Sequence, residues 1–200
     1  DSEYRARASV SSANGATATR PAIISALLDE VDGVEKVKLY PNPTSVTTSG
    51  GVPPYSLLTV VYGGTTSAIS TKLYEVLGVN TTTYGNTSYD ITTEDGSTET
   101  IYHTKATEVF VDLRITYTPY NGKNLTDSEK EDIQEYFSDV ESNLSIGSPI
   151  NIYSLSSAVF KGLSVNRLNF LQIETKLSTE SDDDFLNVSY EIGATELGRL

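Results

Sequence analysis

The stretch EVFVDLRITYT, residues 108–118, decides the fold of the second half of this chain. Its apolar side chains occupy every second position, at Val109, Val111, Leu113, Ile115 and Tyr117. A period of two is typical of a strand with one face on a core and the other in water. After the turn signal Asn121-Gly122, Thr126 and Glu129 have the spacing of a capping box that begins an amphipathic helix. The second half is therefore expected to open with a strand and a helix.

The first half holds the same kinds of element in a different chain order. Pro21 suits a first helical turn, and apolar residues then recur at the helical period until Asp32-Gly33 ends the helix. A half-buried strand over 34–40 follows. A compact apolar run over 57–62 predicts a buried strand, and the helix after it closes at Gly78.

One internal similarity links the two halves. Residues 22–39 and 153–170 both have the pattern of a helix, a short turn and a strand. Four pairs of matching positions are apolar in both segments: Ile24 with Leu155, Val34 with Val165, Val37 with Leu168, and Leu39 with Phe170. We therefore expect two related α/β units.

Three further strands are expected between and after these parts. Asp95-Gly96 marks the turn of a hairpin between two weak strands. Near the end of the chain, an acidic turn at 182–184 leads into an alternating strand from Leu186 to Ile192.

Together these elements predict an α+β fold made of two small related α/β units. The first has the order helix-strand-strand-helix, the second has the order strand-helix-helix-strand-strand, and a β-hairpin connects them. The expected parts are an N-terminal helical arm over 1–18, the first α/β unit over 19–87, the hairpin connector over 88–106 and the second α/β unit over 107–200. Because each unit is small for burying its faces alone, we expect it to pack against the other unit or against neighbouring subunits.

The composition excludes several classes of function. The 200 residues include no Cys and one His, which removes disulfides and Cys nucleophiles and leaves little for a zinc centre. A net charge of -13 disfavours nucleic acid, because phosphates are bound chiefly by clustered Lys and Arg. No apolar run long enough for a membrane span and no signal peptide is present. The absence of Met, with Asp1 at the start, indicates a piece of a larger parent protein.

The sequence contains no recognisable catalytic motif. His103 would need a nucleophile elbow to form a Ser-His-Asp site, and no G-x-S-x-G occurs, so we expect His103 to be an exposed strand-end residue. The cluster of Glu180, Asp182, Asp183 and Asp184 lacks the spaced ligands of an EF-hand, which favours a solvated turn over a cation site. We expect no enzyme activity, no catalytic residue, no cofactor and no metal.

Loops are the stronger candidates for function. The segment from Pro41 to Ser56 is rich in Pro and Gly and longer than an ordinary connection, as contact loops often are. Tyr is enriched at interfaces, and 13 Tyr residues are available. The candidate interface residues lie in this loop and in segment 80–88: Tyr55, Pro53, Pro54, Tyr84 and Asn86.

Several motifs, taken in chain order, carry a resemblance to a known family. They are DSEYRAR at 1–7, DGVEKV at 32–37, PNPT at 41–44, GVPPYS at 51–56, TVVYGG at 59–64, LGV at 77–79, TYGN at 83–86 and IGSPI at 146–150. In order and spacing they resemble the C-terminal part of the baseplate J-like family, the wedge proteins of contractile phage tails and related injection machines. Where that family often has Arg-Pro before its next strand, this chain has HTKA at 103–106.

The resemblance implies a structural subunit of a phage tail baseplate wedge, with no catalytic residues. Such a subunit packs with copies of itself and with other wedge and hub proteins, in a ring around the tail hub that rearranges on contraction. Its implied location is the tail baseplate of the virion, after synthesis in the host cytoplasm. The alternative is a carbohydrate-binding or adhesin module, which the richness in Tyr, Asn and Thr would suit.

Overall fold

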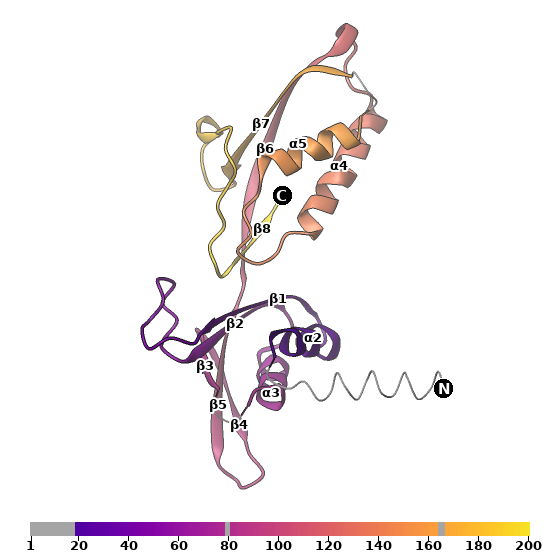
Figure 1. Ribbon diagram of the computed structural model, residues 1–200. Coiled ribbons are helices and arrows are strands. Elements are labelled where there is room, and N and C mark those ends of the chain that lie inside the picture. The colour runs from indigo at the N-terminus through magenta and orange to yellow at the C-terminus, as the bar shows by residue number, and fades with distance from the viewer. Residues whose placement is uncertain (1–18, 79–80, 164–166) are drawn as a thin grey trace, which may run out of the picture. The chain divides into compact units, whose positions relative to one another are not determined.

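The chain contains helices and strands in mixed sheets, which confirms the α+β class (Figure 1). The computed structural model describes residues 19–78, 81–163 and 167–200. The chain divides into two compact units, Asp1–Ala106 and Thr107–Leu200. The expected arm over 1–18 and the expected strand position Val165 lie outside the described residues.

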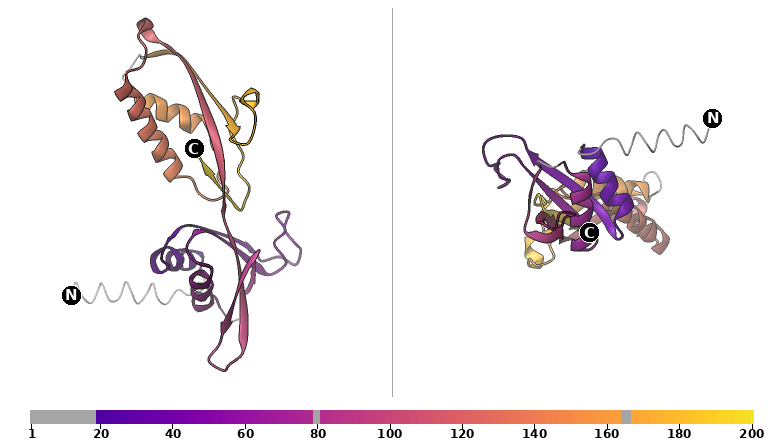
Figure 2. Two further views of the ribbon diagram at one scale, coloured as in Figure 1. Left: turned by 180° about the vertical axis from the view of Figure 1, so that it is seen from behind. Right: turned by 90° about the horizontal axis from the view of Figure 1, so that it is seen from below.

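The first unit is one mixed sheet with two helices. Its elements are α2 (Arg20–Glu30), β1 (Val34–Asn42), β2 (Ser56–Gly63), α3 (Thr66–Val76), β3 (Thr82–Tyr84), β4 (Thr87–Thr92) and β5 (Thr98–Lys105). The strand order is β1-β2-β5-β4, and β3 pairs with β2. β1 is antiparallel to β2, while β3 and β5 are both parallel to β2. Figures 1 and 2 show α2 and α3 beside each other on one face of this sheet.

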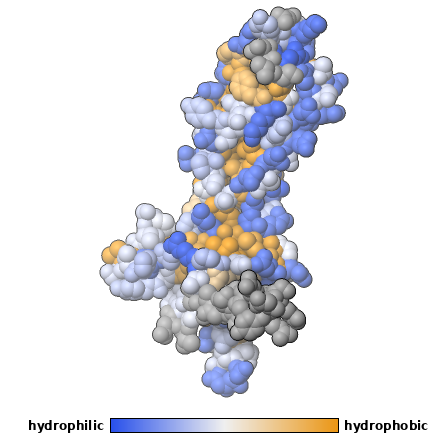
Figure 3. Space-filling model, turned by 45° about the vertical axis from the view of Figure 1, so that its right-hand side comes forward, coloured by the Kyte–Doolittle hydropathy of each residue, from blue (hydrophilic) through white to orange (hydrophobic). Residues whose placement is uncertain are grey.

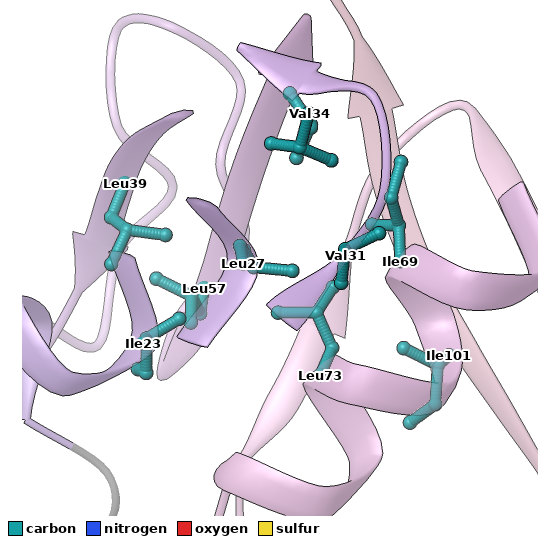
Figure 4. Packing of buried hydrophobic residues seen from close by; sticks show 10 residues of the cluster. Ile23, Leu27, Val31, Val34, Leu39, Leu57, Ile69, Leu73 and Ile101 are labelled. Carbon is teal, nitrogen blue, oxygen red and sulfur yellow. The ribbon is translucent and has the colours of Figure 1, made fainter. Parts of the chain in front are cut away.

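The core of the first unit lies between that sheet face and the two helices (Figure 4). Leu27 of α2 and Leu73 of α3 have no solvent exposure, and they pack in one cluster with Leu57 of β2. Every residue from Ser56 to Val61 is buried, so β2 is the fully buried strand that its apolar run predicts. Gly63 makes the turn after β2 possible, because a Cβ there would lie 2.0 Å from the carbonyl oxygen of Gly33.

The hairpin expected as a connector belongs instead to the sheet of the first unit. β4 and β5 pair around the turn at Asp95-Gly96, as predicted. However, β5 also pairs with β2 through Val60↔Thr104 and Val61↔Lys105. The sequence hides this second pairing because β5 is mostly polar, so its own pattern does not show that it lies next to the buried strand.

The second unit is a three-stranded sheet with two helices on one face. Its elements are β6 (Thr107–Pro119), the 3-10 turn η1 (Tyr120–Gly122), α4 (Asp127–Ser142), α5 (Ile152–Lys161), β7 (Leu168–Leu177), the 3-10 turn η2 (Asp182–Asp184) and β8 (Glu196–Arg199). The strand order is β7-β6-β8, with β7 antiparallel and β8 parallel to β6. The predicted capping box of α4 is confirmed, since the backbone and side chains of Thr126 and Glu129 bond reciprocally. The alternating residues of β6 pack in the core under the helices, with Val111 fully buried.

The expected last strand, Leu186 to Ile192, is wrong. This segment makes only two isolated bridges, Thr175↔Leu186 and Ile150↔Tyr190. The last strand is β8, which is short and carries a single large apolar residue, Leu197. Its position depends on pairing with the start of β6, which is far away in the sequence. The alternation of apolar and polar residues within a short segment does not identify such a distant partner.

The two units repeat one arrangement with the chain order permuted. In the first unit α2 and β1 precede β2 and α3, whereas in the second unit β6 and α4 precede α5 and β7. β1 pairs antiparallel with β2, and β7 pairs antiparallel with β6 in the same way. β2 has β5 as a parallel neighbour, and β6 has β8 as its parallel neighbour. The helix-strand pair α2-β1 thus corresponds to α5-β7, the match that the internal similarity predicts.

Candidate interaction surfaces

The loop between β1 and β2 is held in one conformation by a buried amide. Asn42 is 2% exposed, and its Nδ2 donates to the carbonyl oxygens of Val46, Val52 and Pro53 at 2.8 to 2.9 Å. Its Oδ1 accepts from the backbone N and the hydroxyl of Thr44. A loop with a fixed internal scaffold can present side chains with little ordering cost on binding.

Tyr55 is the most distinctive side chain of this loop. It is 66% exposed, and with φ at 54° it is the one described residue other than Gly in the left-handed region. That conformation costs a bulky residue about 1–3 kcal/mol, and such strain is concentrated at functional sites. Pro54 beside it is exposed and Pro53 is half-buried.

Tyr84 is the last residue of β3, the strand that pairs with the start of β2, and Asn86 lies in the bend between β3 and β4. In the register of β3 on β2, Ser56 faces Thr82 and Leu58 faces Tyr84. Because Tyr55 directly precedes Ser56, the structure brings the loop end and β3 to the same end of β2. Tyr84 is 38% exposed, and Asn86 is exposed with its backbone N donating to the Thr104 hydroxyl at 3.3 Å. That these residues contact another subunit stays a prediction.

His103 is not the exposed strand-end residue that the sequence suggests. It has no solvent exposure, and its Nδ1 lies 3.2 Å from the hydroxyl oxygen of the buried Ser70. Burial, together with the nearby charge of Lys105, lowers the pKa of His103 to about 4. The sequence signal for this burial is the alternation of Ile101 and His103 along β5, which turns both toward α3.

The acidic segment 180–184 is exposed, and it surrounds a buried cation. Lys176 is 5% exposed, and its Nζ lies 2.9 Å from Asp112 and 3.6 Å from Asp182. It also donates to the carbonyl oxygen of Glu180, and the ring of Phe185 lies 5.2 Å from the ammonium. Within the described ranges, no three His, Asp or Glu side chains are grouped closely enough to hold a metal ion.

A second exposed aromatic pair escapes the sequence analysis. Tyr153 and Phe160 are 78% and 58% exposed on α5, whose other face packs Leu155 into the core. They are seven residues apart, so they share one side of the helix. Their spacing, offset from that of the buried residues, was the available signal. On the face drawn in Figure 3, apolar residues (orange) reach the surface as patches among hydrophilic ones (blue).

Comparison with known proteins adds a relationship of fold. No protein-family model matches the chain, and no curated protein matches it significantly. Among solved structures, one similar chain belongs to the cryo-EM structure of the anti-feeding prophage (AFP) baseplate, 6-fold symmetrised. The two chains share a similar fold. The TM-score is 0.52 at 12% sequence identity, over 90% of this chain and 36% of the baseplate chain, so this chain spans about a third of that chain's length.

None of the helices in ranges 19–78, 81–163 and 167–200 combines the length and the apolar character that crossing a membrane requires.

Proposed function

We propose that this chain is a structural part of the baseplate of a contractile phage tail or a related injection machine. One observation carries the proposal: a chain of a baseplate assembly shares the fold over 90% of these residues. Both α/β units fall within that match, which is more specific than a likeness confined to one small unit.

The surfaces support an assembly role better than a catalytic one. The features that stand out are a braced loop with a strained, exposed Tyr55 and a helix with two exposed aromatic residues. Aromatic side chains on rigid supports are typical anchors of protein interfaces. His103, on which a hydrolase would most readily depend, is buried against Ser70 and not available to a substrate. We therefore propose a subunit without enzyme activity.

In its finer form the proposal is a wedge subunit of the baseplate J-like kind. The ordered motifs of the sequence support it, among them GVPPYS at 51–56 and TVVYGG at 59–64. Such a subunit would contact its own copies and other wedge and hub proteins in a ring around the tail hub. It would rearrange when the tail contracts, and its place would be the baseplate of the virion.

The test is assembly of the parent protein with the other baseplate proteins, measured by sedimentation velocity. We expect Tyr55→Asp to shift the parent protein from the large complex to slower species, because it places a charge at the proposed contact. Since Tyr55 is 66% exposed, the fold should be unaffected, and circular dichroism checks this.

Two control variants make the result specific. Tyr55→Phe keeps the ring and should assemble, while Tyr89→Asp places the same charge on another exposed Tyr, in β4, and should also assemble. If the Tyr55→Asp variant assembled normally, Tyr55 would not be an interface residue. If the unmodified parent protein failed to join any baseplate complex, the proposed function would be wrong.

A further inference from the structure

The sheet of the first unit has one face that no described helix covers. α2 and α3 pack on the opposite face, in the core cluster that includes Leu57 and Val61 of β2 (Figure 1). Side chains alternate between the two faces of a sheet, so Leu58, Val60 and Tyr62 of β2 point to the face without helices. We call it the open face, and Leu58 and Val60 form its buried floor.

Tyrosine and lysine side chains from the neighbouring strands surround this floor. The β1 residues opposite Tyr62, Val60 and Leu58 are Lys36, Lys38 and Tyr40, in that order. On the other side of β2, Tyr84 of β3 lies opposite Leu58, and Tyr102 of β5 points the same way because the residue before it packs in the core. Lys38, Tyr84 and Tyr102 are exposed. An apolar floor surrounded by Tyr is typical of the centre of a protein interface.

The centre of the open face is positive, although the chain as a whole is acidic. Lys36 and Lys38 lie beside the buried floor. The acidic residues of the margin are Glu35, in the bulge at the start of β1, and Asp90, which accepts a hydrogen bond from the Thr100 hydroxyl at 2.7 Å. The loop over residues 43–55 contains no charged residue. A negatively charged surface is therefore attracted here, despite the net charge of -13.

α4 carries a surface of the complementary charge. Asp132, Glu135 and Asp139 are spaced so that they share one side of the helix, which we call the acidic side of α4. All three are exposed, and none is in an ion pair with another described residue. The acids of α4 that are already paired within the second unit, with Lys130, Arg167 and Arg199 respectively, are Asp127, Glu129 and Glu141. The acidic side is thus available to cations of another molecule.

The spacing of the charges on the two surfaces matches. Side chains two residues apart on a strand are separated by about 7 Å. Side chains one turn apart on a helix are separated by about 5–6 Å. Because Lys side chains are long and flexible, Lys36 and Lys38 can meet two carboxylates of the acidic side at once.

We propose that the open face binds the acidic side of α4 of a second copy of this chain. Lys38 then lies against Glu135, and Lys36 lies against one of its acidic neighbours. Since the two surfaces belong to different units, each copy can bind one neighbour through its open face and another through α4. Such head-to-tail contacts form a ring when the rotation between copies closes. The inference rests on the proposed function for the ring, whereas the contact itself rests on these two surfaces.

Disulfide trapping locates the contact, because the chain contains no Cys of its own. Lys38→Cys and Glu135→Cys are made as separate variants, one of them with a mass tag, then mixed under mild oxidation and separated by non-reducing electrophoresis. A preformed contact raises the effective concentration of the two thiols, so we expect roughly tenfold more mixed dimer than Lys38→Cys forms with Ser157→Cys. Ser157 is exposed on α5, away from the acidic side of α4.

Charge exchange tests which groups make the contact. Lys38→Glu and Glu135→Lys should each weaken self-association of the chain about tenfold in sedimentation velocity, because like charges then face each other. Both substitutions in one chain should restore it to within about threefold, since every contact again joins a Lys and a Glu. Lys123→Glu makes the same change of charge at another exposed lysine and should have no effect.

Three results would overturn the proposal: equal trapping at Ser157, no recovery in the double variant, and no self-association of the unmodified chain. These outcomes differ from failure of the proposed function. A parent protein that joins the baseplate complex although the chain does not self-associate retains the function and lacks this contact. A chain that self-associates through these charges, but whose parent protein never joins a baseplate complex, has the contact without the function.

Discussion

The two units share one arrangement of helices and strands, but they bury polar groups of different kinds. In the first unit the buried polar side chains are neutral, with Asn42 bracing a loop and His103 lying against Ser70. In the second unit the most buried charge is Lys176, which is compensated by Asp112 and by the turn that carries Asp182. The comparison teaches that fold and polar chemistry are separable. The apolar stripes determine the arrangement of helices and strands. The hydrogen bonds and ion pairs that satisfy the buried polar groups differ between the two units.

The largest expected effect tests whether the units are equivalent where their cores correspond. Leu27 in α2 and Leu155 in α5 occupy matching helices, and both are fully buried. We expect Leu27→Ala and Leu155→Ala each to cost about 2–5 kcal/mol, from lost apolar burial and the cavity left behind. Denaturant unfolding gives the totals, and hydrogen exchange shows which unit loosens. A cost under about 1 kcal/mol at one site would break the equivalence.

As the pH falls, the first unit should lose stability before the second. Because the pKa of His103 is lowered to about 4 in the folded chain, stability is full above pH 6.5 and falls as the pH drops toward 4, where the unfolded chain binds the proton more readily. The difference between 6.5 and about 4 corresponds to roughly 3 kcal/mol. Hydrogen exchange of the first unit should record this loss, and His103→Gln should remove it.

The second unit should lose stability at lower pH than the first. The hydrogen-bonded ion pair between Glu129 and Arg167 lowers the pKa of Glu129 to about 2. Hydrogen bonds from Ser178 and Lys176 lower the pKa of Asp112. A carboxylate with a lowered pKa stabilises the fold above its unfolded value, and this contribution disappears as the pH falls through the folded value. Loss of the second unit's protection near pH 6 would contradict the distinction between the units.

A smaller effect is expected at the asparagines that brace each unit. Asn42 donates three hydrogen bonds to the loop before β2, whereas Asn187 donates one, to the carbonyl oxygen of Ile173. Asn42→Ala should cost about 1–3 kcal/mol and speed exchange of the loop amides, because buried carbonyl groups lose their donor. Asn187→Ala is the matched control, with a smaller cost measured in the same denaturant experiment. Similar costs for both would show that the loop does not depend on Asn42.

The smallest effect has the opposite sign. Tyr55→Gly should raise stability by up to about 1 kcal/mol, because Gly adopts a φ of 54° without strain. The same variant should impair assembly in sedimentation velocity, since the ring is lost. A gain in stability together with a loss of assembly would show that the strained backbone at Tyr55 serves assembly at the expense of stability. Unchanged assembly would indicate that the strain at Tyr55 serves the loop alone.

Local patterns predict much of this fold, and non-local contacts account for the rest. The alternation of β6, the capping box at Thr126 and the buried run of β2 are properties of short segments, and the structure confirms each of them. β8 was missed because its pairing with β6 joins distant parts of the chain. The membership of β5 in the first sheet was missed for the same reason.

The candidate surfaces show the same division. Pro and Gly locate the loop that carries Tyr55, but they do not reveal that Asn42 holds it from inside. His103 was predicted to be exposed because polar residues usually are; the alternation with Ile101 marks its side of β5, but the approach of Ser70 and of the backbone at Gly85 is not visible in the sequence. The role of Lys176 as the centre of the acidic turn likewise depends on residues from three separate segments.

Electron cryo-microscopy of tail particles assembled with the parent protein tests the central claim most directly. We predict density in the baseplate into which both units fit, with Tyr55 at a boundary between subunits. Complete, contractile particles that lack this chain, or particles that carry it elsewhere than in the baseplate, would contradict the account.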